Sequence, residues 1–317
     1  MSRSASMTTL PRSVDASVVV PVAGTPRFLP QQVEALVGQV SAPPFEVIFV
    51  LNDAPAADWF ATYPRPRPGG EPVERFRVVE ALDRRTPGHA RNAGVLAAEA
   101  PLILFCDSDD VVSPTWVGSL VDALQTADLA SGPLDVDRLN APRFAAVRGR
   151  RWAEAGATFL DTFPVAPSCN LGVRRSFFLD VGGFDETLRT GQDVDLCFRA
   201  WIRGATWEYR DGALVHYRIR ADLSTLLEQS YRYGRFGRWM ERRVASEVQL
   251  ERADRAVRRW VWILRKVHHL AISELRPRWI WTLGLALGRL RGTLGTSATA
   301  QRPAPPRGRM AGRRKHA

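Results

Sequence analysis

The sequence predicts an α/β fold in which a mostly parallel, Rossmann-like central sheet is flanked by helices and followed by a C-terminal helical extension. Three observations support this class. Short apolar runs alternate with helical stretches through roughly the first 125 residues, which is the pattern of a parallel sheet. From about residue 222 to about residue 293 the pattern is helical. The chain of 317 residues is 45% apolar, which is enough to bury a large core.

Four strands are expected in the first third of the chain, because each is a short apolar run bounded by turn-forming residues. They are "ASVVVPVA" (16–23), "FEVIFVLND" (45–53), "RFRVVEA" (75–81) and "PLILFCD" (101–107). A Pro- and Gly-rich loop is expected over residues 63–72. Ligands of parallel sheets bind beyond the carboxyl ends of the strands, so the polar residues ending the second and fourth strands are expected to share one crevice.

Three helices are expected between and after these strands: "LPQQVEALVGQV" (29–40), "TPGHARNAGVLAAEA" (86–100) and "SPTWVGSLVDAL" (113–124). In the last of these, Ser113 is the expected N-cap and Pro114 the first helical residue. Its spacing predicts an apolar face made of Trp116, Val117, Leu120, Val121 and Leu124.

The second half of the domain is less regular. Residues 182–204 predict a turn followed by a helix, and residues 213–217 ("ALVHY") predict a strand that ends at His216. Helical spacing predicts that the helix buries Val194, Cys197, Phe198 and Trp201.

Four segments are predicted along the chain: a disordered leader (1–14), a globular α/β domain (15–220), a basic, Trp-rich helical extension (221–295) and a disordered basic tail (296–317). Residues 1–220 hold 23 Lys+Arg and 26 Asp+Glu, a net charge of −3, whereas residues 221–317 hold 21 and 7, a net charge of +14. A GC-rich genome would explain Arg in place of Lys, but not the excess at one end. An anionic partner is therefore expected: nucleic acid, a phospholipid surface or a phosphorylated lipid.

Cysteine usage and hydropathy indicate the compartment. Cys106, Cys169 and Cys197 are odd in number and form no CxxC, which argues for a reducing compartment without disulfides or a zinc site. The N-terminal residues lack the apolar core of a signal peptide. Apolar runs such as "WIWTLGLALG" (279–288) are too short to span a bilayer. We expect a cytoplasmic protein whose membrane association, if any, is peripheral, on the inner face of the cell membrane.

The sequence "LILFCDSDD" (102–110) places three carboxylates within four residues after a buried strand. Asp107 and Asp109 suit Mg²⁺ or Mn²⁺, which take one or two carboxylates together with phosphate oxygens. The competing interpretation is a solvated loop in which Asp110 or Ser113 caps the next helix. Considered with the other motifs, the Asp107–Asp109 pair is assigned to a ligand site, and Asp110 to the turn before the helix.

Two further motifs have both a structural and a chemical interpretation. The Gly-opened helix start "GHARNAG" (88–94) suits phosphate, with Arg91 adding a charged fork, or is an ordinary helix that packs Ala93 and Gly94 on the sheet. The fingerprints GxGxxG and GxxxxGK[ST] are both absent from the sequence. In "TGQDVDL" (190–196), Thr190 and Asp193 have the spacing of a capping box, or Asp193 is a general base.

The remaining candidates are one histidine and four tryptophans. His216 is either structural or joins Asp109 in a metal site through a neutral imidazole nitrogen. The tryptophans of the extension lie among Arg residues, and they either pack the helices onto the domain or sit at the headgroups of an anionic membrane. They are Trp260, Trp262, Trp279 and Trp281.

Together these motifs resemble family 2 glycosyltransferases, a group of inverting enzymes with a GT-A fold. No motif is specific alone, but their order and spacing match over roughly residues 15–220. The matching segments are "VVVPV" (18–22), "VLNDA" (50–54), "PGHARNAG" (87–94), "LILFCDSDD" (102–110), "GVRRSFFLDVGGFDETL" (172–188), "GQDVDLCFRAWIRG" (191–204) and "ALVHY" (213–217).

The resemblance implies a role for each matching residue. It places Asp193 as the catalytic base, Asp109 and His216 as metal ligands, and Gln192 and Asp195 on the acceptor side. Residues implied to bind the donor nucleotide are Pro21, Asn52, Asp53, Arg91, Asp107 and Ser108.

The sequence departs from the family pattern at three places. Asn52-Asp53 stands where the family has an acidic pair, which affects base recognition. Gln192 stands where a Glu usually precedes the base, which affects the acceptor side. The QxxRW motif of processive members is missing, since the nearest string is "QSYRY" (229–233). Transfer of a single sugar is therefore expected rather than polymer synthesis.

The expected function is metal-dependent, inverting transfer of one sugar from a nucleotide-sugar donor to an acceptor hydroxyl. A glycan or lipid-linked acceptor of cell-envelope glycan, polysaccharide or glycolipid synthesis is expected. Two alternatives are retained. A nucleotidyltransferase would share the nucleotide crevice and the Asp pair, although the helix after "GGFDE" argues against it. A non-enzymatic binder of nucleic acid or another anionic surface would use the basic C-terminal third, although no nucleic-acid-reading module is recognisable and no specific nucleic acid is expected.

Overall fold

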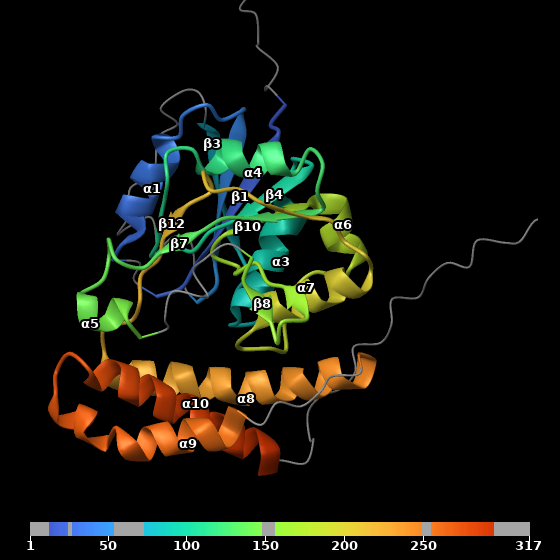
Figure 1. Ribbon diagram of the computed structural model, residues 1–317. Helices are drawn as coiled ribbons and strands as arrows, with labels where there is room; N and C mark the ends of the chain where they lie inside the picture. The colour runs from blue at the N-terminus through green and yellow to red at the C-terminus, as the bar shows by residue number, and fades with distance from the viewer. Residues whose placement is uncertain (1–12, 25–26, 54–72, 148–155, 249–254, 295–317) are drawn as a thin grey trace, which may run out of the picture.

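The computed structural model describes residues 13–24, 27–53, 73–147, 156–248 and 255–294. Within them a central sheet with helices on both faces forms the larger body, and three C-terminal helices form a layer across one end of it (Figure 1). The expected leader (1–14) lies almost entirely outside the described residues, as do the loop 63–72 and the tail (296–317).

The central sheet has seven strands and is mostly parallel, as predicted. Only β10 runs antiparallel to its neighbours β4 and β6, while the other neighbouring pairs are parallel. In spatial order the strands are β11 (Trp207–Tyr209), β6 (Leu129–Ser131), β10 (Leu171–Arg174), β4 (Leu102–Phe105), β1 (Ala16–Val22), β2 (Phe45–Leu51) and β3 (Val73–Glu80). The four strands expected from apolar runs are β1, β2, β3 and β4, so these predictions are confirmed.

The strands are apolar throughout because both faces of the sheet are covered. Alternate residues point to opposite faces, so Val18 and Val20 join one core while Val19 joins the other. The first core includes residues of α1 (Leu29–Val37) and α4 (Trp116–Ala123). The second includes residues of α3 (Pro87–Ala97), α6 (Arg175–Asp180) and α7 (Gln192–Ile202). The expected helices α1, α3, α4 and α7 are confirmed.

Two local details of these helices test the sequence predictions, one against and one in favour. The N-cap of α4 is Thr115, without a side-chain bond, and the Ser113 hydroxyl instead donates to the Gly212 carbonyl at 2.8 Å. The prediction of Ser113 as the cap is therefore wrong. The close packing of α3 on the sheet is confirmed, because a Cβ at Gly94 would stand 2.4 Å from a methyl carbon of Val19.

Two smaller sheets and one short helix complete the domain. β12 pairs antiparallel with β5 and parallel with β7, and β8 pairs antiparallel with β9. The expected strand of residues 213–217 is thus present, but as the two-residue β12. The bounds are β5 (Val111–Val112), β7 (Leu134–Asp135), α5 (Pro142–Ala145), β8 (Thr158–Phe159), β9 (Phe163–Pro164) and β12 (Val215–His216).

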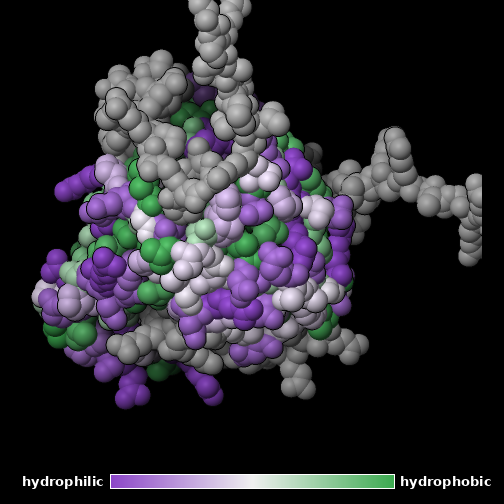
Figure 2. All heavy atoms as spheres, turned by 90° about the horizontal axis from the view of Figure 1, so that it is seen from above, coloured by the Kyte–Doolittle hydropathy of each residue, from purple (hydrophilic) through white to green (hydrophobic). Residues whose placement is uncertain are grey.

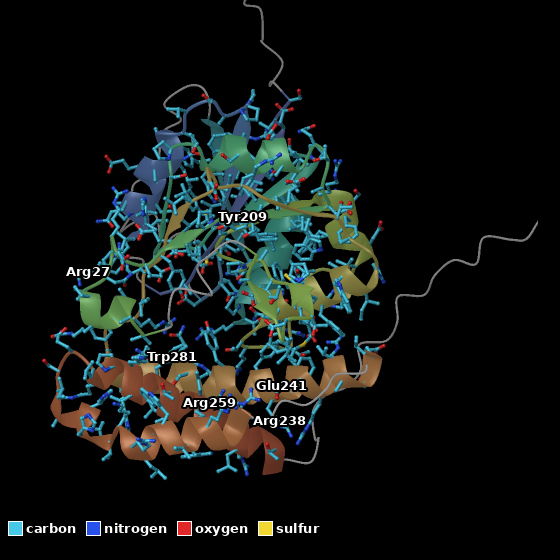
Figure 3. All side chains as sticks on the ribbon, in the orientation of Figure 1. Arg27, Tyr209, Arg238, Glu241, Arg259 and Trp281 are labelled. Carbon is cyan, nitrogen blue, oxygen red and sulfur yellow. The ribbon has the colours of Figure 1, made fainter. Side chains whose placement is uncertain are left out.

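The extension is helical, as predicted, and packs on the domain. It consists of α8 (Leu223–Glu247), α9 (Arg255–Arg265), the 3₁₀ helix η2 (Val267–Ala271) and α10 (Arg276–Leu294). The α8 and α10 backbones meet closely at glycines: a Cβ at Gly288 would stand 2.0 Å from the Tyr231 carbonyl oxygen. Trp281 lies on the side of the helical layer that faces the domain (Figure 3) and is buried against the core of the domain. It meets Tyr233 edge to face. The interpretation that the tryptophans pack the helices onto the domain is therefore confirmed for Trp281. Trp279 is also buried, but it packs within the extension, where its indole N–H donates to the Ile263 carbonyl of α9.

The surface agrees with a folded body of mixed polarity. Seen from above, at the end opposite the helical layer, hydrophobic residues are interspersed among hydrophilic ones (Figure 2). Among the described residues, no helix is both long enough and apolar enough to cross a bilayer.

Candidate active site

Polar residues follow the carboxyl ends of β1 and β2, at the edge of the sheet where ligands of such folds bind. The Asn52 amide donates to the carbonyls of Ala81 and Arg84, each at 2.8 Å, and so joins the ends of β2 and β3. The Asp53 carboxylate accepts the Gly24 backbone N–H, which joins it to the segment after β1. Asn52 and Asp53 therefore shape the sheet edge beside the carboxyl end of β1, where Pro21 lies.

A buried cation comes from the first turns of α3. The Thr86 hydroxyl caps this helix by accepting the His89 N–H. Arg91 is 4% exposed and donates to the Asp107 carboxylate at 2.5 Å. Its guanidinium carbon lies 5.7 Å from the centre of the Phe184 ring. The Arg91 Nε is buried and has no partner among the described residues, which leaves a donor available for an anionic or hydroxyl-bearing ligand.

Three acidic side chains gather after β4. Asp109 as a whole residue is exposed. Protein atoms nevertheless surround its carboxyl group, and this burial, followed by the charge of Asp107, raises its pKa to about 6. Asp110 is 1% exposed, and burial, followed by the charges of Asp109 and Asp107, raises its pKa well above the ordinary value. The ligand atoms of Asp107, Asp110 and Cys169 all lie within 4.8 Å of one another. Excess negative charge is therefore concentrated at this point.

We call Asp107, Asp109, Asp110 and the adjoining Cys169 the acidic cluster, and the segment after β12 crosses it. The Arg218 backbone N–H donates to Asp110 Oδ1 at 2.7 Å, and its Nε donates to the Asp109 carbonyl at 2.8 Å. Its guanidinium carbon lies 3.7 Å from the centre of the Phe28 ring. Asp110 Oδ2 is buried without a partner among the described residues. Asp110 lies at a bend before β5, as its assignment to a turn expected, but it is also buried beside Asp107, and its carboxylate holds the segment after β12.

Asp193 lies in the first turn of α7. The N-cap of α7 is Gly191, at φ 75°, and makes no side-chain bond, so the predicted capping role of Thr190 is wrong. The Asp193 carboxylate accepts the Val194 N–H at 2.9 Å and the Ser168 N–H at 3.2 Å. Ser168 is followed by Cys169 of the acidic cluster, so one short segment connects Asp193 to the carboxylates after β4.

The two residues predicted on the acceptor side are buried. The Gln192 amide donates to the Leu188 carbonyl, one turn earlier. Asp195 is 1% exposed, and its two oxygens accept from Arg199, at 2.8 Å, and from Arg243 of α8. The observed contacts of both residues hold α7 in place, and an acceptor contact for either stays a prediction.

His216 lies at the end of β12, and both of its ring nitrogens have protein partners. Nδ1 lies 2.6 Å from the Asp135 carboxylate, and Nε2 lies 2.7 Å from Arg138. A metal contact with Nε2 would require Arg138 to move away. A shared metal site with Asp109 therefore stays a prediction.

A polar network joins α3 to the turn "GGFDE" and was not anticipated. The Asn92 amide donates to the Phe184 carbonyl and to the Glu186 carboxylate, each at 2.9 Å. His89 contacts Glu186 at 2.9 Å and Asp83 at 2.7 Å. Burial opposes the charged imidazole, but these two carboxylates outweigh it and raise the pKa of His89. The network fixes the start of α3 and thereby the position of Arg91.

Cys169, Ser168 and Arg218 are residues of the site that the sequence did not reveal. A single cysteine or serine has no spacing that marks a site. The third, Arg218, contacts Asp110 through its backbone N–H, a group that every residue except proline carries, so residue type could not mark this contact. The position of Arg218 just after the expected strand 213–217 could have indicated only that this stretch lies near the site.

Comparisons with known proteins point to glycosyltransferases. Residues 17–182 match the model of glycosyl transferase family 2, and residues 102–296 match that of glycosyl transferase family group 2. The pre-mycofactocin glycosyltransferase of Mycobacterium tuberculosis is 32% identical over 169 residues, which cover 50% of this chain and 36% of that protein. The succinoglycan biosynthesis protein ExoO of Rhizobium meliloti is 32% identical over 166 residues, 47% of each chain.

A second succinoglycan biosynthesis protein of the same species, ExoU, is 29% identical over 190 residues, covering 55% of this chain and 54% of that protein. The chain thus spans between about a third and about half of the length of these relatives. Residues 1–349 of TarS from S. aureus superpose with a TM-score of 0.51 at 17% identity, covering 82% of this chain and 73% of that chain. This likeness concerns the fold, and it agrees with the predicted GT-A-like class.

The family 2 match covers more than half of the 317 residues and includes the strand ends, the start of α3 and the acidic cluster. The resemblance expected from the ordered motifs is confirmed: this chain belongs to glycosyl transferase family 2.

Proposed function

We propose that this chain transfers a single sugar from a nucleotide-sugar donor to an acceptor hydroxyl, with inversion at the anomeric carbon and dependence on a divalent metal. The observation that carries the proposal is the connection of two groups through Ser168 and Cys169. Asp193 accepts the Ser168 N–H, and Cys169 adjoins the carboxylates of Asp107 and Asp110. This connection supports the proposal that Asp193 acts as the base next to a carboxylate cluster that binds the donor diphosphate through a metal ion.

The donor is expected to bind at the carboxyl edge of β1, β2 and β4. Arg91 supports this assignment, because its buried Nε has no described partner and a donor phosphate or ribose oxygen would supply one. The same proposal gives Asp107 contact with the ribose. The remaining donor-binding residues are proposed from their place at this edge, and they are Pro21, Asn52, Asp53 and Ser108.

The acidic cluster fits a hard divalent cation such as Mg²⁺ or Mn²⁺. Carboxylates are suitable ligands, and Asp110 Oδ2 is a buried oxygen without a partner among the described residues. Burial of the Asp109 carboxyl group, followed by the charge of Asp107, raises its pKa, and a nearby cation would favour its charged form. We propose Asp109 as the principal ligand, with His216 joining only if its contact with Arg138 is released. The cation would supply positive charge that stabilises the leaving nucleoside diphosphate.

In the proposed reaction, Asp193 accepts the proton of the acceptor hydroxyl as the hydroxyl oxygen attacks the anomeric carbon. The bond from that carbon to the nucleoside diphosphate breaks on the opposite face. The N–H groups of Ser168 and Val194 hold the carboxylate in place for this step. Gln192 and Asp195 are proposed to support the acceptor side by fixing α7.

The proposal also covers the organisation and setting of the protein. We assign residues 15–220 to the glycosyltransferase domain and residues 221–295 to an extension that completes it. The names of the relatives, pre-mycofactocin glycosyltransferase and succinoglycan biosynthesis proteins, support a glycan or another glycosylated acceptor. Lipid-linked acceptors of envelope synthesis belong to this class. We propose that the protein acts in the cytoplasm, peripherally on the inner face of the cell membrane.

A screen of nucleotide sugars with Mn²⁺ tests the donor proposal. At least one donor should be consumed with release of a nucleoside diphosphate, and chelation should stop the release. Asp109→Ala should weaken metal-dependent donor binding at least about tenfold, because one charged ligand is lost. Asp137→Ala, another acidic residue on a loop of the same domain, is the matched control. Release of pyrophosphate would favour the nucleotidyltransferase alternative, and unchanged donor binding in Asp109→Ala would contradict the metal assignment.

We also propose that the extension rests on an anionic membrane through an outer face formed by α9 and residues 266–275. Large apolar side chains are exposed there, including Val261 at 46%, Leu264 at 72% and Val267 at 56%. The cations Arg265 and Lys266 lie between them, and α9 is the helix farthest from the domain (Figure 1). Apolar side chains flanked by cations suit a bilayer interface with anionic headgroups.

Vesicle sedimentation tests this face. Binding to phosphatidylglycerol-containing vesicles should fall roughly tenfold in the double variant Leu264→Gln/Val267→Gln, because two apolar anchors are lost. Leu96→Gln, at a residue of α3 that is 70% exposed on the domain, is the matched control. Equal binding by both variants would contradict the proposal, and tight sequence-specific DNA binding would favour the nucleic-acid alternative.

A further inference from the structure

A pocket of about 140 Å³ lies at the edge of the central sheet opposite β3. Its floor is the β6–β11 edge, and the segment 156–167 closes it. The side chains and backbone that shape it include Ser131, Gly132, Pro164, Pro167, Trp207 and Tyr209. The donor and metal assignments above use none of these residues.

The pocket adjoins the proposed base. Pro167 lines the pocket, and the next nitrogen along the chain, that of Ser168, donates to Asp193 at 3.2 Å. β6 and β11 also run parallel to β4, because β10 between β4 and β6 is antiparallel to both. Tyr209 and Ser131 therefore end at the same edge of the sheet as Asp107.

The lining suits a ring. Its surface is predominantly apolar and includes an indole, a phenol and two prolines. An apolar cavity of about 150 Å³ is large enough to hold one six-membered ring. Trp207 lines the pocket, and its indole nitrogen is buried without a partner among the described residues. A ligand oxygen reaching this N–H from the pocket would supply the missing acceptor.

The second aromatic residue is a neutral donor. Burial, helped by the charge of Asp211, raises the pKa of Tyr209 to about 12. Its phenol is therefore protonated at neutral pH. Tyr209 lies in the body of the domain, well away from the layer of C-terminal helices (Figure 3), so the pocket is separate from the proposed membrane face.

We propose that this pocket is an acceptor subsite, which holds one six-membered ring of the acceptor with its apolar face on the aromatic wall and an oxygen accepting from the Trp207 N–H. The inference rests on the proposed function, since it concerns the acceptor of that reaction. A pyranose and an oxygen-bearing aromatic ring share this chemistry. The subsite would hold the part of the acceptor next to the reacting hydroxyl and so orient that hydroxyl toward Asp193.

Binding is tested directly, without catalysis. The indole N–H signal of Trp207 is identified in a ¹⁵N–¹H spectrum by its loss in Trp207→Phe, and the protein is titrated with methyl glycosides and, separately, with p-cresol. A saturable downfield shift of this signal by either probe supports the subsite, and the responding probe names the ring type. Trp201, which packs on Phe163 and Phe198 outside the pocket lining, provides the internal control signal. No shift with any probe overturns the proposal.

Transfer provides the second measurement. Trp207→Phe keeps an aromatic wall but removes the N–H, and should raise the acceptor KM about tenfold with the donor KM unchanged. Ala157→Leu, which fills the pocket from its outer segment, should do the same if Trp207→Phe proves unstable. Trp201→Phe is the matched control. If the chain transfers sugar and the acceptor KM is unchanged, the subsite is overturned but the proposed function stands. If the probes bind but the chain transfers no sugar, the proposed function is overturned while the pocket is still shown to bind a ring.

Discussion

Replacing Asp193 by Asn is expected to lower the rate of glycosyl transfer about a thousandfold, which is the typical contribution of a general base. The amide has almost the same shape but cannot accept the proton of the acceptor hydroxyl. It also has one acceptor oxygen where the carboxylate has two, so the Ser168 and Val194 N–H groups cannot both be satisfied. That loss should cost about 1 kcal/mol of stability, too little to unfold the domain.

The measurement compares turnover with donor binding in the same preparation. Nucleoside diphosphate binding, followed by thermal shift with Mn²⁺, should be retained in Asp193→Asn, since the donor edge is untouched. Asp185→Asn is the matched control, because Asp185 lies in the preceding turn and bonds only locally with Thr187. Turnover close to that of the parent protein would rule out Asp193 as the base.

Replacing Gly191 by Ala is expected to destabilise the protein by about 4 kcal/mol and to lower activity with it. Gly191 has a φ of 75°, a left-handed conformation that costs other residues about 1–2 kcal/mol. A Cβ there would also stand 2.2 to 2.4 Å from three ring carbons of Phe236 in α8. Overpacking of this kind typically costs a further 1–3 kcal/mol. The start of α7, and Asp193 with it, would have to move away from α8.

The two contributions can be separated by chemical denaturation of matched variants. Gly204 has a φ of 73° with nothing within 4 Å of its Cβ position, so Gly204→Ala should show the backbone cost alone. Adding Phe236→Ala to Gly191→Ala should remove the steric part. Equal destabilisation by Gly191→Ala and Gly204→Ala would show that the α7–α8 contact tolerates a methyl group and that α8 does not position the base helix.

These contacts give the C-terminal extension a part in the site. Phe236 lies against the start of α7, and Arg243 pairs with the buried Asp195. The boundary at residue 220 therefore marks a change in sequence pattern, but side chains on its two sides pack against each other in the structure. We infer that α8 supports α7, the helix that carries Asp193, and that the outer helix α9 is the part of the extension that contacts the proposed anionic membrane.

The sequence by itself determined the class of fold and most of its elements. The apolar runs of β1, β2 and β4 could be recognised because a strand buried on both faces needs apolar residues at every position. The alternation of strands and helices then placed Asp53, Asp107 and Asp109 at strand ends, and parallel pairing brings those ends to one edge. These inferences depend on neighbours in sequence or on a rule of topology.

Tertiary structure alone decided which polar groups meet. Asp110 belongs to the site because Arg218, 108 residues later, passes over it. Asp193 reaches the acidic cluster through the Ser168–Cys169 segment, whereas Thr190, its expected local partner, gives way to Gly191. The burial of Trp281 likewise depends on where α10 lies against the domain. Burial and hydrogen bonding depend on distances between residues far apart in the chain, and local spacing carries no information about those distances.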